Sequence, residues 1–268
     1  MKYNIILLSN QDIFWMLDIM LHSIHLNCDT DFINKIFIAD IGLNEKSRRK
    51  ISKYKLVEFI DTGININGGN GPVHSAEWSG AVWQKTRYIQ HVLERTDLPL
   101  IYSDIDTIVC RDFASFIDPE FDFQITRRVA PASFSGFVAR YISSFFIFNN
   151  HEKSLEMLDA IRAHMKMLQD SGQKPPYETQ ALNQIDLSGW NVGYLWDEHI
   201  SCDNDYVENS TCIIHYKSNQ FCRDNTLLRL FLIYLRRTDV VRKNIPRRYW
   251  RLLRQCAVNP PWARTIKI

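Results

Sequence analysis

Short apolar runs alternate with helical patterns through the first part of the chain, and this alternation restricts the fold more than any other feature. The runs Asn4–Ser9, Lys35–Ile41 and Leu56–Asp61 predict strands. Between them, Ile13–Ile24 repeats its apolar residues at helical spacing, and Glu45–Tyr54 has the pattern of a basic helix. Strands that alternate with helices indicate a mostly parallel α/β sheet with helices on its faces.

The rest of the chain continues the alternation with longer elements. Ser75–Glu94 predicts a helix, which leads into an apolar strand that begins near Leu98. Tyr141–Phe148 is strongly β-like, and a prolyl pair at 175–176 ends the amphipathic segment that follows it. The remaining predicted elements are a strand at Asp122–Thr126, helices at Lys153–Leu168 and Glu178–Ile185, and strands at Val192–Leu195 and Cys212–His215.

The stretch Leu98–Asp112 carries two carboxylates at the point where its first apolar run stops. In an extended segment the side chains at i and i+2 point the same way, so we expect Asp104 and Asp106 to share one face. Ligands of open α/β sheets bind at the carboxyl ends of strands, and paired carboxylates suit a hard divalent cation. The same tripeptide can also be a polar strand end. Other parts of the sequence are therefore needed to distinguish a metal site from a strand end.

Length and composition predict an ordinary globular protein that is large enough to bury a full core. The 268 residues are 46% hydrophobic, and the six cysteines show no CxxC spacing, which argues against a zinc or disulfide framework. The apolar run after Met1 is too short for a secretory signal, so we expect a cytoplasmic protein. We divide the chain into a catalytic domain, residues 1–226, and a C-terminal extension, residues 227–268.

The C-terminal extension is strongly basic. From Arg229 to the end, eleven Lys or Arg residues accompany one acidic residue, whereas the preceding part has 21 basic and 29 acidic residues. Arg247–Arg254 combines cations with interfacial aromatic residues, a composition suited to an anionic lipid surface. Nucleic acid is not expected, since no recognised binding motif is present. The alternative is a helix that packs on the domain and turns its charged face to solvent.

The residues around Asp104 and Asp106 resemble a known family. Trp83-Gln84-Lys85, the stretch LIYSDIDTIV and Asp112-Phe113 are similar to the nucleotide-sugar-dependent glycosyltransferases of GT-A fold, in particular the retaining family-eight type and its capsule and lipopolysaccharide relatives. The resemblance implies a Rossmann-like mixed sheet flanked by helices. It also implies that Asp104 and Asp106 hold manganese, or magnesium, and the donor diphosphate, and that Lys85 reaches the nucleotide sugar.

Three later segments extend the resemblance over about the first 220 residues. Tyr141–Asn150 is similar to the strand that lines the sugar pocket, with Ser143 and Ser144 in its polar positions but without the usual Asn and Gly. Tyr177–Asn183 is similar to a DQxxLN helix start, with Glu178 in place of the Asp and Thr179 in place of the Gln. Ile213–Lys217 is similar to the last strand, whose His is a metal ligand, although Gly and Pro-Trp do not follow.

The chemistry of nucleotide-sugar transfer agrees with these residue types. A divalent cation neutralises the charge that develops on the leaving diphosphate, and Asp104, Asp106 and His215 supply a mixed nitrogen and oxygen ligand set. Lys85 and Lys217 add positive charge near the diphosphate. Glu178 is the candidate for the carboxylate that acts on the oxocarbenium-like sugar. The donor is expected to be a UDP-sugar and the acceptor a surface glycan.

Each assignment has a structural alternative. His215 could be a hydrogen-bonded core histidine, Lys85 could be solvated on a helix face, and Glu178 could be a first-turn acidic residue favoured by the helix dipole. Two other functions also remain open from the sequence: a sugar nucleotidyltransferase, and a degenerate, membrane-associated module that binds a glycan or nucleotide without catalysis.

Overall fold

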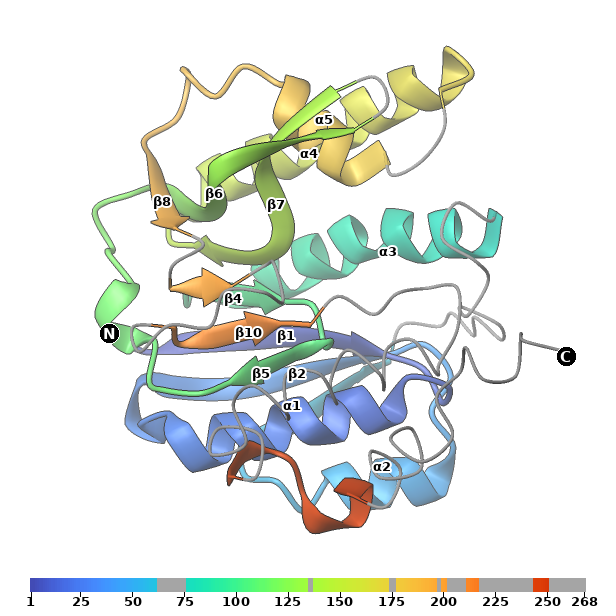
Figure 1. The fold of residues 1–268 in the computed structure, drawn as a ribbon, viewed down its shortest axis with the longest axis vertical. Coiled ribbons are helices and arrows are strands. Elements are labelled where there is room, and N and C mark those ends of the chain that lie inside the picture. Colours follow the sequence, from blue (N-terminus) through green and yellow to red (C-terminus); the bar gives the residue numbers. More distant parts are fainter. Residues whose placement is uncertain are drawn as a thin grey trace, which may run out of the picture.

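A mixed sheet forms the centre of the computed structural model, which describes residues 1–61, 76–134, 137–173, 177–196, 199–201, 211–216 and 243–250. In the described part of the chain this sheet has seven strands in the order β3-β2-β1-β4-β7-β6-β8 (Figure 1). All pairings are parallel except those that β7 makes with β4 and β6. The strands are β1 Tyr3–Ser9, β2 Ile33–Asp40, β3 Val57–Asp61, β4 Leu100–Ser103, β6 Phe123–Phe134, β7 Phe137–Phe148 and β8 Val192–Trp196.

Helices cover both faces of the sheet, as the alternating pattern predicts. α1 (Phe14–Asn27) and α2 (Glu45–Ile51) lie on one face, and α3 (Ala76–Leu93), α4 (His151–Asp170) and α5 (Tyr177–Gln184) lie on the other (Figure 1). Two hydrophobic cores result, one on each face. The near-continuous apolar composition of β1 follows from this burial on both sides, since Ile5 packs into the first core and Ile6 into the second.

A small second sheet lies beside the end of β4. It consists of β5 (Thr107–Val109), β10 (Ile213–His215) and β9 (Ile200–Ser201), in the order β5-β10-β9. β5 and β10 pair antiparallel, with His215 opposite Thr107. The chain therefore leaves the main sheet after Ser103 and enters the second sheet at Thr107, and β10 brings a distant part of the sequence next to this crossing.

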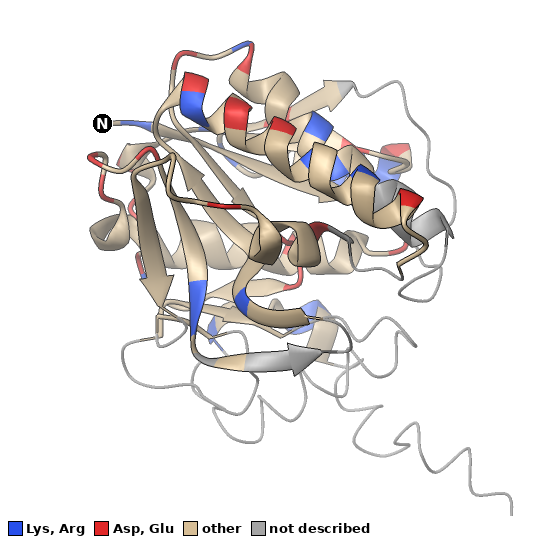
Figure 2. Ribbon diagram, turned by 90° about the horizontal axis from the view of Figure 1, so that it is seen from above, with Lys and Arg blue, Asp and Glu red and all other residues tan. Residues whose placement is uncertain are grey.

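The outer face of α4 is charged and the inner face is apolar. Asn150 caps the helix by accepting a hydrogen bond from the Lys153 amide, and Lys153 forms an exposed ion pair of 2.8 Å with Glu156. Both acidic and basic residues occur along this helix, as Figure 2 shows. Met157 and Ile161 on the opposite side are buried in the core below, so the helix has the amphipathic pattern expected of a surface helix.

The described part of the C-terminal extension, residues 243–250, packs on the face that carries α1 and α2. Ile245 and Tyr249 are buried in the core of that face. Asp18 of α1, which is 0% exposed, accepts hydrogen bonds from Arg248 at 2.6 Å and from the hydroxyl of Tyr249. Residues 243–250 of the basic extension therefore pack on the domain, which is the alternative given in the sequence analysis. The predicted boundary at residue 226 lies outside the described residues.

The predicted mixed α/β sheet flanked by helices is confirmed, and the expected elements agree with the observed ones within a few residues at most ends. Two features differ. β6 and β7 are each 12 residues long and extend beyond the predicted strands. The short strands β5 and β9 each pair with β10 in a separate sheet that the sequence pattern did not distinguish. None of the helices in the described ranges is long and apolar enough to span a membrane.

Candidate active site

Asp104 and Asp106 lie in the bend between β4 and β5, at the crossing from the main sheet to the second sheet. The expected extended segment is not observed, because residues 104–106 form a bend rather than a strand, although ligand atoms of the two carboxylates still lie within 4.8 Å of each other. Two backbone hydrogen bonds hold the bend: the Asp104 amide donates to Ser144 of β7 at 2.8 Å, and the Tyr216 amide donates to the Asp106 carbonyl at 3.0 Å. Both neighbouring strands thus fix the positions of the carboxylates.

Asp104, Asp106 and His215 converge at this bend. One ligand atom from each of the three lies within 4.8 Å of the other two, and Nε2 of His215 is 3.1 Å from Oδ1 of Asp106. His215 is 7% exposed and reaches the bend because β10 pairs with β5. Two carboxylate oxygens and one imidazole nitrogen around one point fit a divalent cation such as manganese or magnesium, and leave further coordination positions for a phosphate.

Lys85 of α3 lies next to this group and is 6% exposed. Its Nζ donates to Oδ1 of Asp104 at 3.1 Å, to the carbonyl of Ser143 at 2.7 Å and to Glu178, whose Oε1 is 3.0 Å away. All three ammonium hydrogens therefore have acceptors within the protein. Burial acts to lower the pKa of Lys85, but the two carboxylates outweigh burial and raise it. The charge of Lys85 is thus directed at Asp104 and Glu178 rather than at solvent.

Glu178 lies in the first turn of α5 and is buried against the same ammonium group. It is 6% exposed, and burial raises its pKa from the usual 4.5 to about 7. Lys85 and a hydrogen bond from Ser143 act in the opposite direction, while Asp104 adds to the increase. A carboxyl with a pKa near neutral, beside residues that could bind a metal, is typical of functional sites.

Tyr102 is a site residue that the sequence interpretation missed. Its hydroxyl donates to Oδ1 of Asp104, and Nζ of Lys85 lies 4.3 Å from the centre of its ring. The signal was available, because Tyr102 lies near the end of β4, two residues before Asp104. Tyr102 therefore orients one candidate metal ligand and provides a cation–π partner for Lys85.

The remaining predicted site residues are Ser143, Ser144 and Lys217. Ser143 contacts Lys85 through its carbonyl, and its hydroxyl lies 3.2 Å from the hydroxyl of Thr179. Ser144 contributes its carbonyl to the bend at Asp104, while its side chain is buried. Lys217 lies outside the described residues. The structure thus brings Lys85, Asp104, Asp106, Glu178 and His215 to one region, together with Ser143 and Ser144 of β7.

The fold and this region define a class of protein. A Rossmann-like sheet that places an Asp-x-Asp group at the end of a central strand is the architecture of enzymes that bind nucleotide-diphospho-sugars in GT-A fashion. The family model described as nucleotide-diphospho-sugar transferase matches residues 41–223. The chain therefore belongs to the nucleotide-diphospho-sugar transferase family, and the predicted resemblance and glycosyltransferase class are confirmed.

Solved structures support the same fold. The galactosyltransferase LgtC in complex with donor and acceptor sugar analogues aligns with a TM-score of 0.57 at 14% identity, over 92% of this chain and 99% of that one. Mouse xyloside xylosyltransferase 1 aligns with a TM-score of 0.55 at 11% identity, over 82% and 99%. The bifunctional glycosyltransferase WbbM aligns with a TM-score of 0.55 at 11% identity, over 81% of this chain and 46% of that one. The search of curated protein sequences gave no match.

Proposed function

We propose that this chain is a metal-dependent glycosyltransferase that transfers a sugar from a UDP-sugar to a surface polysaccharide or lipopolysaccharide acceptor. The observation that carries the proposal is the convergence of Asp104, Asp106 and His215 within 4.8 Å at the end of β4. In an open α/β sheet of this kind, the carboxyl ends of the strands are where ligands bind. The cofactor is manganese or magnesium, and the nucleotide-sugar is the co-substrate.

The side chains of the site have separate roles in the proposed reaction. Asp104, Asp106 and His215 would hold the cation, which when bound neutralises charge on the leaving diphosphate. Lys85 keeps the carboxylates of Asp104 and Glu178 in place through one contact to each, while its third hydrogen bond goes to the Ser143 carbonyl. Glu178 in its ionised form faces the region where positive charge develops on the sugar and stabilises it electrostatically.

Because the sequence departs from the family pattern, nucleotide binding should be tested before sugar transfer. Ser143 and Ser144 take the polar positions of the family's sugar-pocket strand, but the usual Asn and Gly are missing there, as are the Gly and Pro-Trp after Lys217. These changes leave a non-catalytic binding module as the second candidate function. That candidate predicts metal-dependent nucleotide binding without release of sugar from any donor. A sugar nucleotidyltransferase would instead form diphosphate bonds from a nucleoside triphosphate and a sugar phosphate.

Calorimetric titration with UDP, with and without manganese, tests the site. We expect manganese-dependent binding that is lost in Asp104→Ala and in Asp106→Ala. Asp112→Asn is a matched control, since this carboxylate is exposed in the same stretch and accepts a hydrogen bond from the Ala114 amide. Unchanged binding in both alanine variants would show that the carboxylates do not form the metal site.

Donor hydrolysis across a panel of nucleotide-sugars then separates the two candidate functions. Release of free sugar from one UDP-sugar is the result expected of the transferase, and release from none, despite tight UDP binding, would favour the binding module. Proton NMR of the transferred sugar reads its anomeric configuration directly. Retention is the outcome that the family resemblance implies, and inversion would contradict it.

We also propose that the enzyme works at the cytoplasmic face of a membrane, where its basic extension contacts anionic lipid. The support is the composition of residues 227–268, with eleven basic residues from Arg229 onward. Because Arg248 and Tyr249 bind Asp18, removal of the whole extension would also disturb the domain. Sedimentation with phosphatidylserine vesicles should therefore compare the full chain with Arg251→Gln/Arg254→Gln. Equal pelleting of the two would count against this contact.

A further inference from the structure

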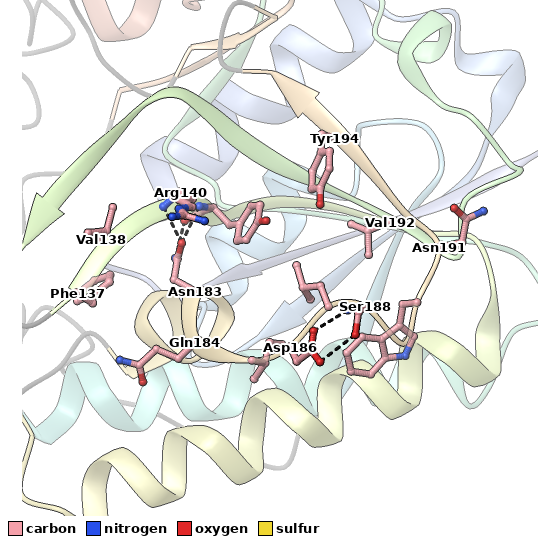
Figure 3. Close-up of a pocket in the computed structure, with 14 residues that line it drawn as sticks. Phe137, Val138, Arg140, Asn183, Gln184, Asp186, Ser188, Asn191, Val192 and Tyr194 are labelled. Carbon is pink, nitrogen blue, oxygen red and sulfur yellow. Dashed lines mark hydrogen bonds between the residues drawn. The ribbon is translucent and has the colours of Figure 1, made fainter.

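A pocket of about 810 Å³ lies beside the start of β7, and the residues of the proposed metal site do not line it (Figure 3). Its wall is formed by the first residues of β7, the end of α5, the loop after α5 and the start of β8. A second hollow of about 430 Å³ adjoins it toward α4 and shares Gln184, Asp186 and Trp190 with it. The volume of the first pocket is typical of small-molecule sites, and the two hollows together make an elongated surface.

Aromatic side chains form a rigid part of the pocket wall. Tyr141 and Tyr194 stack with their rings 8° from parallel and their centres 5.8 Å apart, and the guanidinium carbon of Arg127 lies 4.7 Å from the centre of the Tyr194 ring. Trp190 packs on the buried ring of Phe123, 6.0 Å away. These rings are held in place without a ligand, so a ligand would find contact area with little loss of conformational entropy.

Polar side chains complete the lining and are also held by the protein. Asp186 accepts hydrogen bonds of 2.9 Å from both the amide and the hydroxyl of Ser188, as Figure 3 shows. The side-chain amide of Asn191 donates to the Glu120 carbonyl at 2.8 Å. Among the described lining residues, Arg140 is the single basic one and Asp186 the single acidic one. A phosphate would therefore meet opposed charges, whereas a neutral ligand with hydroxyl groups would meet donors and acceptors.

Successive contacts between β7 and α5 connect this pocket to the candidate active site. Ser143, which touches Lys85, faces Thr179 at 3.2 Å. Two residues earlier in β7, the Tyr141 amide donates to Asn183 at 2.8 Å, one helical turn beyond Thr179. Along a strand, two residues span roughly 7 Å. The pocket and the candidate active site therefore lie near each other along β7 and α5.

We propose that this pocket is a second carbohydrate site, which holds part of the acceptor glycan away from the bond being formed. As an acceptor site it rests on the transferase function proposed above. A pyranose ring has an apolar C–H face and a rim of hydroxyl groups, and the pocket offers aromatic surface next to amide, hydroxyl and carboxylate groups. Binding here would position the glycan chain and leave the reaction itself to the residues near Asp104.

Saturation-transfer NMR on the full chain, with maltotriose, chitotriose and xylotriose at millimolar concentration, tests the pocket. We expect signals from at least one trisaccharide, lost when Ser188→Trp fills the pocket with a bulky side chain at an exposed position. Gln184→Trp blocks the shared wall independently, should the first variant misfold. Arg49→Trp adds the same side chain on α2, where the arginine side chain is 78% exposed, and should keep the signals.

Manganese-dependent UDP binding, measured on the same samples, separates the two proposals. We expect it to be unchanged in both blocking variants, which also shows that they fold. Two results would overturn the proposed carbohydrate site and leave the transferase proposal standing. In the first, the native chain binds UDP but gives no trisaccharide signal. In the second, UDP binds and the trisaccharide signals persist in both blocking variants. If the blocking variants abolish the trisaccharide signals and no sample binds UDP, the carbohydrate site stands and the proposed transferase function is overturned.

Discussion

Two buried carboxylates on opposite faces of the sheet have opposite electrostatic surroundings. Glu178 belongs to the reaction cluster, which we define as Lys85, Asp104 and Glu178. Asp18 belongs to the anchor cluster, in which Lys50, Arg248 and the hydroxyls of Tyr54 and Tyr249 all contact one carboxylate. The reaction cluster has two carboxylates for one cation, whereas the anchor cluster has two cations for one carboxylate.

The pKa values of the two carboxylates follow this difference. Burial acts to raise the pKa of Asp18, but hydrogen bonds from Arg248, Lys50 and Tyr249 outweigh burial and lower it. For Glu178 the burial effect prevails, and the pKa rises to about 7. Asp18 is thus satisfied by its neighbours, while the reaction cluster has an excess of negative charge that a further cation would relieve. Such incomplete compensation is typical of functional sites and is not expected of purely structural ones.

The largest effect should come from the anchor cluster. Asp18→Asn removes the charge that Arg248 and Lys50 face, and breaking a buried ion pair costs about 3 kcal/mol. We take the lower end of the usual range because both cations are partly exposed and can turn to water. Denaturant unfolding should show this loss, while donor hydrolysis per folded molecule stays unchanged. Hydrogen exchange should show faster exchange in residues 243–250.

A surface ion pair provides the control for Asp18→Asn. Asp159 pairs with Arg162 on α4 and its side chain is 70% exposed. Asp159→Asn should change the free energy of unfolding by less than about 0.5 kcal/mol. Equal effects of the two substitutions would mean that the Asp18 contacts do not stabilise the fold.

The reaction cluster should show the reverse response to the same kind of substitution. Glu178→Gln keeps the size of the side chain but removes the negative charge, so kcat for donor hydrolysis should fall about 100-fold with little loss of stability. Glu152→Gln in the first turn of α4 is the matched control for the helix-dipole interpretation. If Glu178→Gln lowers only stability, as an ordinary first-turn substitution would, then Glu178 has no part in the reaction.

The contrast between the clusters also explains what the sequence could predict. Asp104, Glu178 and His215 were found because each stands near the end or start of an element whose pattern is clear, whereas Lys85 lies within α3 and was found through the family resemblance. Their convergence could be expected from the family order, but the bend at Asp104 could not. A change of sheet between Ser103 and Thr107 leaves no signal in a run that is apolar on both sides.

The anchor cluster was not predicted at all. Asp18 is the single acidic residue of α1, and its partners are up to 231 positions away in the sequence. Nothing in the local pattern links Asp18 to Arg248, and the basic composition of the extension pointed to an external anionic partner instead. Charge composition indicates that a segment needs a negative partner, but only the tertiary structure shows that for Arg248 this partner is Asp18 of the same chain.

The two clusters should give opposite pH dependences of stability. The pKa of Glu178 is higher in the folded state than its usual 4.5, so its contribution is full below about pH 4.5 and is lost as pH rises to about 7. The slope is at most about 1.4 kcal/mol per pH unit. The pKa of Asp18 is lowered from 3.8, so its contribution is present above that pH and is lost on acidification. Denaturant unfolding between pH 3 and 8 measures both, and the decline toward pH 7 should be absent in Glu178→Gln.

The smallest effect should come from the more peripheral cation of the anchor cluster. Lys50 lies 2.7 Å from Asp18 with its side chain 36% exposed, and it also faces the ring of Tyr249 at 5.4 Å. Because Arg248 and Tyr249 remain in contact with the carboxylate, Lys50→Gln should lower the free energy of unfolding by less than about 1 kcal/mol. The pKa of Asp18 should then rise, so that acid unfolding begins at higher pH than in the native chain. A Lys50→Gln variant as unstable as Asp18→Asn would show that the carboxylate depends on both cations together.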